Sequence, residues 1–242
     1  MTRRLRIVGR GRLGRALTAA LAGSDGWEVE LVAGHTTTPS AAAGVDLVLL
    51  CVPDAAIADV AGRLAPEASA VVAHCSGATG LDVLEPHERR ASLHPLVSVP
   101  DEVRGAAALV GGWYAVSGDP LVAELVEALR GRSVAVADGD RQRYHAAAVV
   151  ASNHLVALMG QVERIAGSMG LPLDAFLDLA RGSLDNVAEL GAGAALTGPV
   201  ARGDWATVRA HLAAIDTSER AAYLAGVELA ARLAGHDDVP VE

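Results

Sequence analysis

"LRIVGRGRLGRALTAAL" (residues 5–21) places three glycines between a short apolar run and a segment with apolar residues at helical spacing. The run before Gly9 is typical of a buried strand, and the pattern around and after Gly14 is typical of a helix. In such a turn Gly9 permits the tight bend, Gly11 lets the backbone approach a diphosphate, and Gly14 lets helix and strand pack closely. The stretch therefore predicts the first βα unit of a nucleotide-binding α/β domain.

The turn is the expected diphosphate site, because the N–H groups at a helix N-terminus attract anions. A lone G-x-G-x-x-G pattern is weak evidence, and here the strand before it and the helix after it supply the context that the motif requires. The residues expected to bind a dinucleotide in this turn are Gly9, Arg10, Gly11, Arg12, Leu13 and Gly14.

A second strand is expected in "WEVELVAG" (residues 27–34), and the residue that selects the ribose should follow it. No carboxylate stands there, so both the acceptor for a 2′-hydroxyl and the repulsion of a 2′-phosphate are missing. We therefore expect NADP, with His35, the hydroxyls of residues 36–38 and Arg10 as phosphate donors. NAD stays open as an alternative, because no arginine follows the strand.

Composition limits the possible partners. The chain has 242 residues and a formal net charge of −9, and all of its 20 basic residues are arginine. The absence of lysine excludes a P-loop and a Schiff base, and the negative charge disfavours nucleic acid as a partner. No apolar run approaches the ~20 residues of a membrane span, and no secretory signal is visible, so a cytoplasmic protein is expected. Cys51 and Cys75 are expected to be small apolar fillers, and no metal-ligand spacing appears.

Two further apolar strands are expected in "VDLVLLCVP" (residues 45–53) and "SAVVAHCSG" (residues 69–77). Too few residues separate the first of them from the preceding strand for a full crossover helix, so this part of the fold should be trimmed or irregular. The segment Val52, Pro53 and Asp54 and the residue Ser76 follow these strands. They should therefore lie at the carboxyl edge of the sheet, where open α/β sheets bind ligands.

The pattern changes after residue 137 from alternating strands and helices to helices alone. We expect a doubly wound parallel sheet of Rossmann type over residues 1–137 and an all-α domain over residues 138–242. The first helix of that domain should run for about 30 residues and be apolar on most faces, which is typical of a central or intersubunit helix.

Five motifs after the glycine turn carry a resemblance to a known group of proteins. They are "CVPDAAI", "HCSGATGLDVL", "SLHPLVSV", "YHAAAVVASNHLVAL" and "ALTGPVARGD", and together they extend over nearly the whole chain. The sequence resembles a bacterial Rossmann-like family whose C-terminal half is a domain of unknown function. That family is similar to the 6-phosphogluconate dehydrogenase and pyrroline-5-carboxylate reductase superfamily and to alternative ketopantoate reductases. The resemblance implies a nicotinamide cofactor, a 6-phosphogluconate dehydrogenase-like helical domain that forms a homodimer, and a small carboxylate substrate.

The residue that donates the proton must differ from the one used in the superfamily. Its β-hydroxyacid dehydrogenases use a lysine one helical turn before an asparagine; Asn153 matches the asparagine, but Val149 stands in place of the lysine. His145 lies two turns before Asn153, and the ordinary pKa of the histidine side chain, about 6.5, suits a proton donor near neutral pH. The alternative is a histidine near the start of a helix that only satisfies local backbone groups. His94, which follows a strand and precedes a proline, is the competing donor. His74 lies within an apolar strand and is expected to be a hydrogen-bonded core residue.

The remaining candidates concern the substrate. Arg202, in a loop fixed by glycines and a proline, is expected to hold a carboxylate, because a guanidinium can bind it through two parallel hydrogen bonds. The alternative is a structural ion pair with Asp204 or another acidic residue. Thr197 is expected to bind the same ligand or to cap a turn. Ser76 is expected either to contact the nicotinamide amide or the substrate, or to be only a small residue where the strand turns. Asn153 would orient the carbonyl group, or else satisfy backbone groups between helices.

These residues predict an NADP-dependent oxidoreductase that transfers a hydride to a small 2-oxo acid in a cleft between the domains, with 2-dehydropantoate as the first candidate. Two alternatives stay open. One is a non-catalytic NADP-binding sensor, favoured by the missing lysine and the trimmed segment. The other is an imine or prephenate-type dehydrogenase of the same superfamily, although a content of only three Trp, three Tyr and one Phe disfavours an aromatic pocket.

Overall fold

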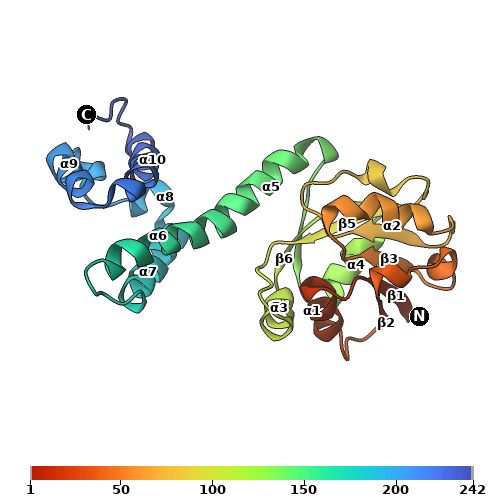
Figure 1. Ribbon diagram of the computed structural model, residues 1–242. Coiled ribbons are helices and arrows are strands. Elements are labelled where there is room, and N and C mark those ends of the chain that lie inside the picture. Colours follow the sequence, from red (N-terminus) through yellow and green to blue (C-terminus); the bar gives the residue numbers. More distant parts are fainter. Residues whose placement is uncertain (1, 241–242) are drawn as a thin grey trace. The chain divides into compact units, whose positions relative to one another are not determined.

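The computed structural model describes residues 2–240. The chain forms two compact units, Met1–Ser152 and Asn153–Glu242, and each is described here by itself (Figure 1). The strands end before residue 138, where the sequence places its domain boundary, but the first unit continues through the start of the helical region. It does so because Arg141 and Tyr144 contact strands of the sheet.

The first unit contains a seven-stranded sheet in the order β2-β1-β3-β4-β5-β6-β7. Strands β1 to β5 are parallel, whereas β6 is antiparallel to β5 and β7 is parallel to β6. The predicted Rossmann-like sheet is confirmed, with a reversed pair of strands at one edge. The bounds are β1 Arg3–Val8, β2 Trp27–Val32, β3 Leu47–Leu50, β4 Val71–His74, β5 Arg90–Pro95, β6 Trp113–Gly118 and β7 Arg132–Ala135.

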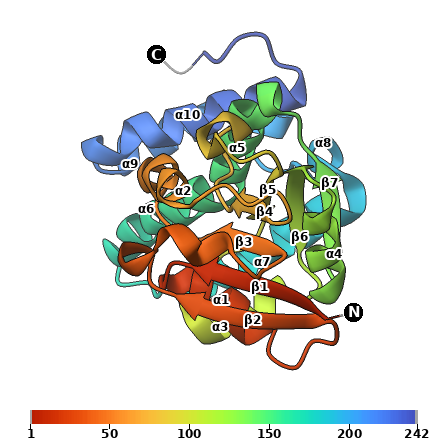
Figure 2. The ribbon, with the colours of Figure 1, turned by 90° about the vertical axis from the view of Figure 1, so that its right-hand side faces the viewer.

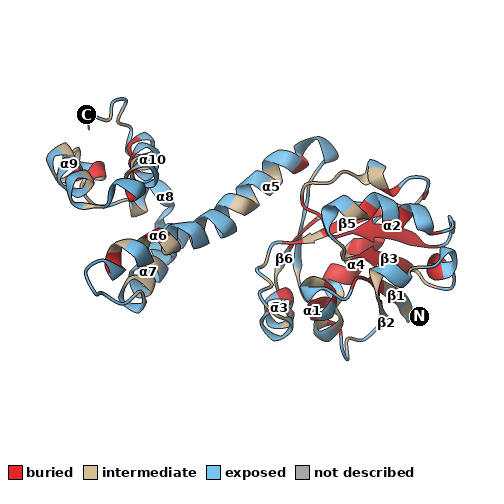
Figure 3. Cartoon of the chain, in the orientation of Figure 1, coloured by how far each residue is buried: buried red, intermediate tan, exposed pale blue. Residues whose placement is uncertain are grey.

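Helices cover both faces of this sheet. Leu47 and Leu49 of β3 pack in a core with α1 (Arg12–Ala20), α3 (Glu102–Leu109) and α4 (Leu121–Ala128), and Figures 1 and 2 show α1 beside α3. Val48 and Leu50 face the opposite core, which contains α2 (Ile57–Arg63). Burial on both faces explains why β3 is apolar at every position (Figure 3). Each buried leucine contributes roughly 1.5–3 kcal/mol.

The connection from β2 to β3 is irregular, as its length predicts. Two short 3-10 turns, η1 (Gly34–Thr36) and η2 (Pro39–Ala42), replace a crossover helix. Ala41 and Ala42 of η2 are buried against the α2 side of the sheet. Three more 3-10 turns, η3 (Asp54–Ala56), η4 (Leu81–Leu84) and η5 (Asp138–Asp140), follow strands of the same unit.

A continuous helical segment leaves the first unit. It begins as α5 (Arg141–Val149), passes through a π-helical turn, η6 (Val150–His154), and continues as α6 (Leu155–Gly167). The long helix was predicted, but in this structure most residues of its middle third are exposed rather than buried. π-Helical turns are rare and are often found at functional sites.

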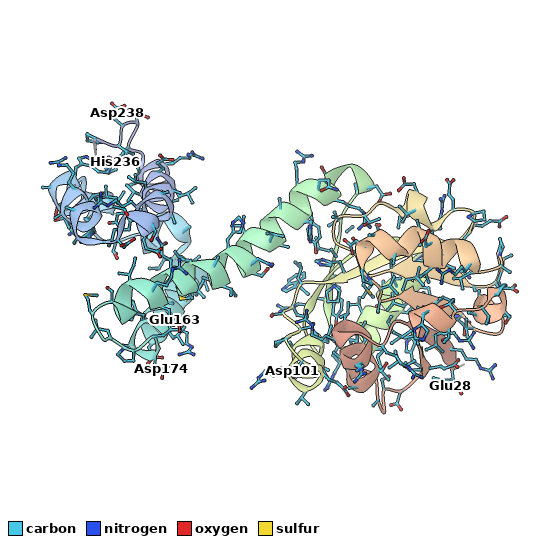
Figure 4. All side chains as sticks on the ribbon, in the orientation of Figure 1. Glu28, Asp101, Glu163, Asp174, His236 and Asp238 are labelled. Carbon is cyan, nitrogen blue, oxygen red and sulfur yellow. The ribbon has the colours of Figure 1, made fainter. Side chains whose placement is uncertain are left out.

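The second unit is all-helical over its described residues 153–240, with a small core of Val200, Val208, Val227 and Ala231. In it Arg164 of α6 pairs with Glu219, and His236 lies edge-on to Trp205, with ring centroids 5.4 Å apart; Figure 4 labels His236. No helix within residues 2–240 is long and apolar enough to cross a membrane. The remaining elements are α7 Asp174–Leu190, α8 Ala192–Ala195, η7 Val200–Arg202, α9 Trp205–Ala214 and α10 Thr217–Ala234.

Candidate active site at the carboxyl edge of the sheet

The glycine turn between β1 and α1 is held by close backbone contacts. Gly9 has a φ of +124°, and a Cβ there would lie 2.2 Å from the carbonyl oxygen of Cys51. A Cβ on Gly14 would lie 1.9 Å from the carbonyl oxygen of Gly9. The Gly9 N–H donates to the carbonyl of Val32, at 2.9 Å. Both glycines are therefore required by the fold, as the motif predicts.

Gly11 has a different environment, because no atom lies within 4 Å of the position that its Cβ would take. It is the N-cap of α1, no side chain caps that end of the helix, and the first turn contains no acidic residue. The first N–H groups of α1 therefore lack acceptors within the helix and carry a partial positive charge. Arg10 and Arg12 are exposed on either side of Gly11, and the turn fits a diphosphate.

The end of β2 is rich in hydrogen-bond donors and has no acid. A guanidinium nitrogen of Arg10 donates to the carbonyl of Leu31 at 3.4 Å, which places this cation beside the strand end. His35 is exposed in η1. The hydroxyls of Thr36 and Thr37 donate to the carbonyls of Ala33 and Gly34, so their protons stabilise the turn and are not directed outward as expected.

Beyond β3 and β4, a hydroxyl and a carboxylate join the two strand ends. Ser76, which is buried, donates through Oγ to Oδ2 of Asp54 at 2.7 Å. The backbone N–H of Thr79 donates to the same Oγ at 3.0 Å. Val52, Pro53 and Asp54 thus lie at the carboxyl edge with Ser76, as predicted, but the serine proton is already used by the aspartate.

His74 is the core histidine that the sequence predicts. It is fully buried, and its Nδ1 accepts from the backbone N–H of Ser76 at 3.2 Å. Its Nε2 therefore carries the proton and donates to the carbonyl of Gly80, at 3.2 Å. Burial lowers the pKa of His74, so the ring stays neutral and shapes the turn after β4.

His94 and His145 lie side by side at this edge. Their ring centroids are 5.9 Å apart, and Nδ1 of His94 lies 2.5 Å from the hydroxyl oxygen of Tyr144. Gly77 packs against both imidazoles, because a Cβ there would lie 2.9 Å from Cε1 of His94 and 2.7 Å from Cδ2 of His145. The structure thus brings together both predicted proton donors, with a glycine that leaves room for them.

Burial and neighbouring charge define the protonation of His94 and Tyr144. Burial, and after it the neighbouring His145, lower the pKa of His94 to about 4. Burial raises the pKa of Tyr144 to about 12. At neutral pH the phenol therefore keeps its proton and can donate it in this bond. With the phenol as donor to Nδ1, the single N–H proton of the neutral His94 ring lies on Nε2.

Arg141 anchors the start of α5, the helix of Tyr144 and His145, to the sheet. Its side chain is buried, and its Nε donates to Oδ1 of Asp138 at 2.7 Å. A terminal nitrogen contacts the hydroxyls of Ser92 on β5 and Ser117 on β6. These contacts fix the helix turn that carries Tyr144 and His145 against the sheet.

Sequence reasoning missed Tyr144, Gly77 and Arg141 as site residues. The signal available for two of them was their position: Arg141 and Tyr144 precede His145 by one turn and by one residue on a helix already considered catalytic. Nothing in the local pattern indicated that Gly77 would lie between two imidazoles. Its role depends on β5 and α5, which are distant in the sequence.

The other predicted residues belong to the second unit. Asn153 lies in the π-helical turn η6 and is exposed. Thr197 is exposed, and Arg202 ends the short helix η7 with its side chain exposed. Asp204 caps α9 by accepting from the backbone N–H of Thr207 at 3.1 Å. Hydrogen bonds from Thr207, and after them the charge of Arg202, lower the pKa of Asp204, so the arginine interacts with this carboxylate without a direct ion pair among residues 2–240.

No group of His, Cys, Asp and Glu side chains in the described part of the chain is arranged to hold a metal ion. Cys51 and Cys75 are free thiols, with their sulfur atoms 3.6 Å apart between the ends of β3 and β4.

Two family models match the sequence. Residues 30–100 match a Rossmann-like domain, and residues 115–229 match a domain of unknown function, DUF2520. The chain thus carries a Rossmann-like domain followed by a DUF2520 domain, in agreement with the resemblance seen in its motifs. The DUF2520 match begins within β6 and ends within α10, so it includes most of β6, all of β7 and most of the helical region. No protein with a curated function matches the sequence.

Solved structures similar to this chain match it over nearly its whole length. Protein TM1727 from Thermotoga maritima is 27% identical with a TM-score of 0.72, and the match covers 96% of this chain and 98% of that one. BF3122 from Bacteroides fragilis, named as an NADP oxidoreductase, is 18% identical with a TM-score of 0.80 and the same coverage. A pyrroline carboxylate reductase from Plasmodium falciparum with NADP bound is 13% identical with a TM-score of 0.64, again with coverage of 96% and 98%. The last two similarities establish the fold.

Proposed function

We propose that this protein is an NADP-dependent oxidoreductase that reduces the carbonyl group of a small 2-oxo acid, with 2-dehydropantoate as the first candidate. The observation that carries the proposal is that a diphosphate-binding glycine turn and a neutral, hydrogen-bonded histidine stand at the same carboxyl edge of one sheet. The choice of cofactor is supported by two similar structures: BF3122 is named for NADP, and the Plasmodium reductase has NADP bound.

The residues of the first unit fit this cofactor. Gly9 and Gly14 shape the turn, the open space at Gly11 admits the diphosphate, and the uncapped N-terminus of α1 attracts its charge. Arg10 and His35 are the proposed ligands of a 2′-phosphate: Arg10 lies beside the end of β2, His35 is exposed just after it, and no carboxylate follows β2 to repel the phosphate. When bound, the nicotinamide supplies the hydride.

His94 supplies the polar contact that a carbonyl group needs during reduction. Its Nε2–H donates to the carbonyl oxygen, where negative charge develops, and Tyr144 holds the ring in the tautomer that keeps the proton there. A neutral imidazole can act as such a hydrogen-bond donor at pH 7 without first binding a proton. His145, next to His94, is the alternative source of the proton that completes the alcohol.

Arg202 remains the proposed ligand of the substrate carboxylate, with Thr197 as a second donor and Asn153 as the residue that orients the carbonyl. Support comes from the exposure of Arg202 in its short loop helix. A guanidinium binds a carboxylate through two parallel hydrogen bonds, which would explain a preference for oxo acids over neutral ketones.

We also propose a cytoplasmic homodimer formed through the helical unit. Leu179, Val187 and Leu190 lie on one face of α7 and are 69%, 43% and 59% exposed. An apolar stripe of this kind is unfavourable in water and is typical of a subunit interface. Light scattering of the purified protein should give twice the 24.7 kDa mass of one chain, and a monomer would contradict this part of the proposal.

The test is a fluorescence titration of NADPH with purified protein, with NADH in parallel, followed by addition of 2-dehydropantoate. We expect micromolar binding of NADPH, weaker binding of NADH, and oxidation of NADPH on addition of the substrate. Binding of NADPH without turnover of 2-dehydropantoate would mean that the substrate is another oxo acid or an imine. Binding without turnover on a broad panel of these would favour the sensor function, and no binding of either dinucleotide would refute the proposal.

A further inference from the structure

Cys51 and Cys75 occupy neighbouring positions on two adjacent parallel strands. The register pairs Leu50 with His74, so each cysteine is the next residue beyond that pair. Their sulfur atoms lie 3.6 Å apart, within hydrogen-bonding distance for two thiols. Neighbouring strands are about 4.8 Å apart, which falls within the roughly 4.4–6.8 Å between Cα atoms that a disulfide can bridge. The two thiols can therefore be joined with little movement of the backbone.

The cysteine pair adjoins the glycine turn between β1 and α1. The carbonyl oxygen of Cys51 packs against Gly9 so closely that a Cβ on the glycine would lie 2.2 Å from it. The backbone N–H of Cys51 donates to the carbonyl of Val8, the last residue of β1, at 2.8 Å. Cys75 immediately precedes Ser76, which is bonded to Asp54. A change at these cysteines is thus transmitted to the backbone that shapes the dinucleotide site.

We propose that Cys51 and Cys75 form a peroxide-sensitive dithiol, which closes into an intramolecular disulfide across β3 and β4 and thereby weakens dinucleotide binding at the adjoining turn. The formation of the bridge is independent of the proposed function, whereas its effect on the dinucleotide rests on that function. Neither cysteine is needed for the carbonyl chemistry assigned to His94 and Tyr144.

The disulfide forms in two steps, and the exposure of the two cysteines decides which one reacts with peroxide first. Cys51 is partly exposed and Cys75 is buried, and contact with Cys51 together with burial raises the pKa of the Cys75 thiol. Hydrogen peroxide therefore reacts first with the Cys51 thiolate, which becomes a sulfenic acid as the O–O bond breaks and hydroxide leaves. The Cys75 sulfur, losing its proton, then attacks Cys51 Sγ; the S–S bond forms, the S–O bond breaks and water leaves. Overall, two thiols are oxidised and one peroxide is reduced to two waters.

The bridge is tested by alkylating the full-length protein in denaturant after treatment with hydrogen peroxide and weighing it by mass spectrometry. The chain has 2 cysteines, so we expect 2 alkylated thiols before treatment, none after it, and 2 again after reduction with dithiothreitol. In Cys75→Ala, oxidation should stop at a Cys51 sulfenic acid that dimedone traps, whereas Cys51→Ala should yield no dimedone adduct. Persistence of both thiols in excess peroxide, or a first adduct at Cys75, would overturn the proposal.

The coupling is tested by NADPH titration of the reduced and the bridged protein. We expect the bridged protein to bind at least ~3-fold more weakly, and Cys75→Ala to keep the affinity of the reduced protein when no peroxide is added. Equal affinity of reduced and bridged protein would overturn the coupling and leave only a structural bridge. If the reduced protein binds no NADPH, the coupling fails together with the proposed function, while the mass measurement still decides the dithiol.

Discussion

Tyr144 and His94 are joined by a hydrogen bond of 2.5 Å between the phenol hydroxyl and Nδ1, although they are 50 residues apart in the sequence. The bond links α5 to the end of β5 and sets the tautomer of the histidine that faces the carboxyl edge. Removal of the hydroxyl should therefore affect chemistry more than binding.

For Tyr144→Phe we expect kcat to fall about 10-fold or more, with KM and the affinity for NADPH nearly unchanged, because only the orientation and tautomer of His94 are lost. Steady-state kinetics over a range of pH would measure this. Tyr223→Phe is the matched control, since Tyr223 bonds to His211 at 2.7 Å in the second unit. Equal losses in both variants would mean that the Tyr144 bond is merely structural.

The depressed pKa of His94, about 4, makes stability depend on pH. Between pH 6.5 and 4 the unfolded chain binds a proton at this residue and the folded chain does not, so stability rises with pH across that window. The free energy of unfolding should fall by about 1–2 kcal/mol from pH 7 to pH 5 on account of this residue. Urea unfolding at both pH values should show a smaller fall for His94→Gln than for the wild type; the exposed His35→Gln serves as the control. Parallel curves for all three proteins would refute the assignment.

Gly77→Ala should disturb the histidine pair, because the added Cβ would lie 2.7 Å and 2.9 Å from ring atoms of His145 and His94. We expect a large loss of kcat and a destabilisation of about 1–3 kcal/mol. Gly62→Ala in α2 is the control: no atom lies within 4 Å of its Cβ position, and alanine there should be neutral or stabilising. Thermal unfolding and kinetics measure both effects, and an active, stable Gly77→Ala protein would exclude the arrangement described.

Gly11→Ala should separate dinucleotide binding from folding. The fold has room for this Cβ, so the melting temperature should change little. The methyl group would project into the open space before α1 and hold a diphosphate away from the helix N-terminus, weakening NADPH binding by about 10-fold or more. Unchanged affinity in a fluorescence titration would show that the diphosphate is bound elsewhere.

Arg202→Ala should raise KM and lower kcat/KM for a carboxylate substrate by about 10- to 100-fold, as expected when a charged hydrogen-bonded contact is lost. The affinity for NADPH should stay nearly constant. Arg181→Ala is the control, because Arg181 is an exposed arginine of the same unit that pairs with Asp178. A collapse of NADPH binding in Arg202→Ala would reassign this residue to the cofactor.

The sequence by itself determined the features that depend on neighbouring residues. The glycine turn, the strand and helix around it, the missing carboxylate after residue 32 and the short link before residue 47 are local, and each appears in the structure as predicted. Their geometry follows from backbone freedom and apolar periodicity, which short segments already contain.

Only the tertiary structure decided which side chains meet. An apolar strand pattern does not encode direction, so the reversal of β6 and β7 was hidden until they paired with β5. The contacts of His94 with Tyr144, of Gly77 with two imidazoles and of Cys51 with Cys75 each join separate elements. Such contacts are fixed by the packing of strands and helices around a shared core, and no short window of sequence contains both partners.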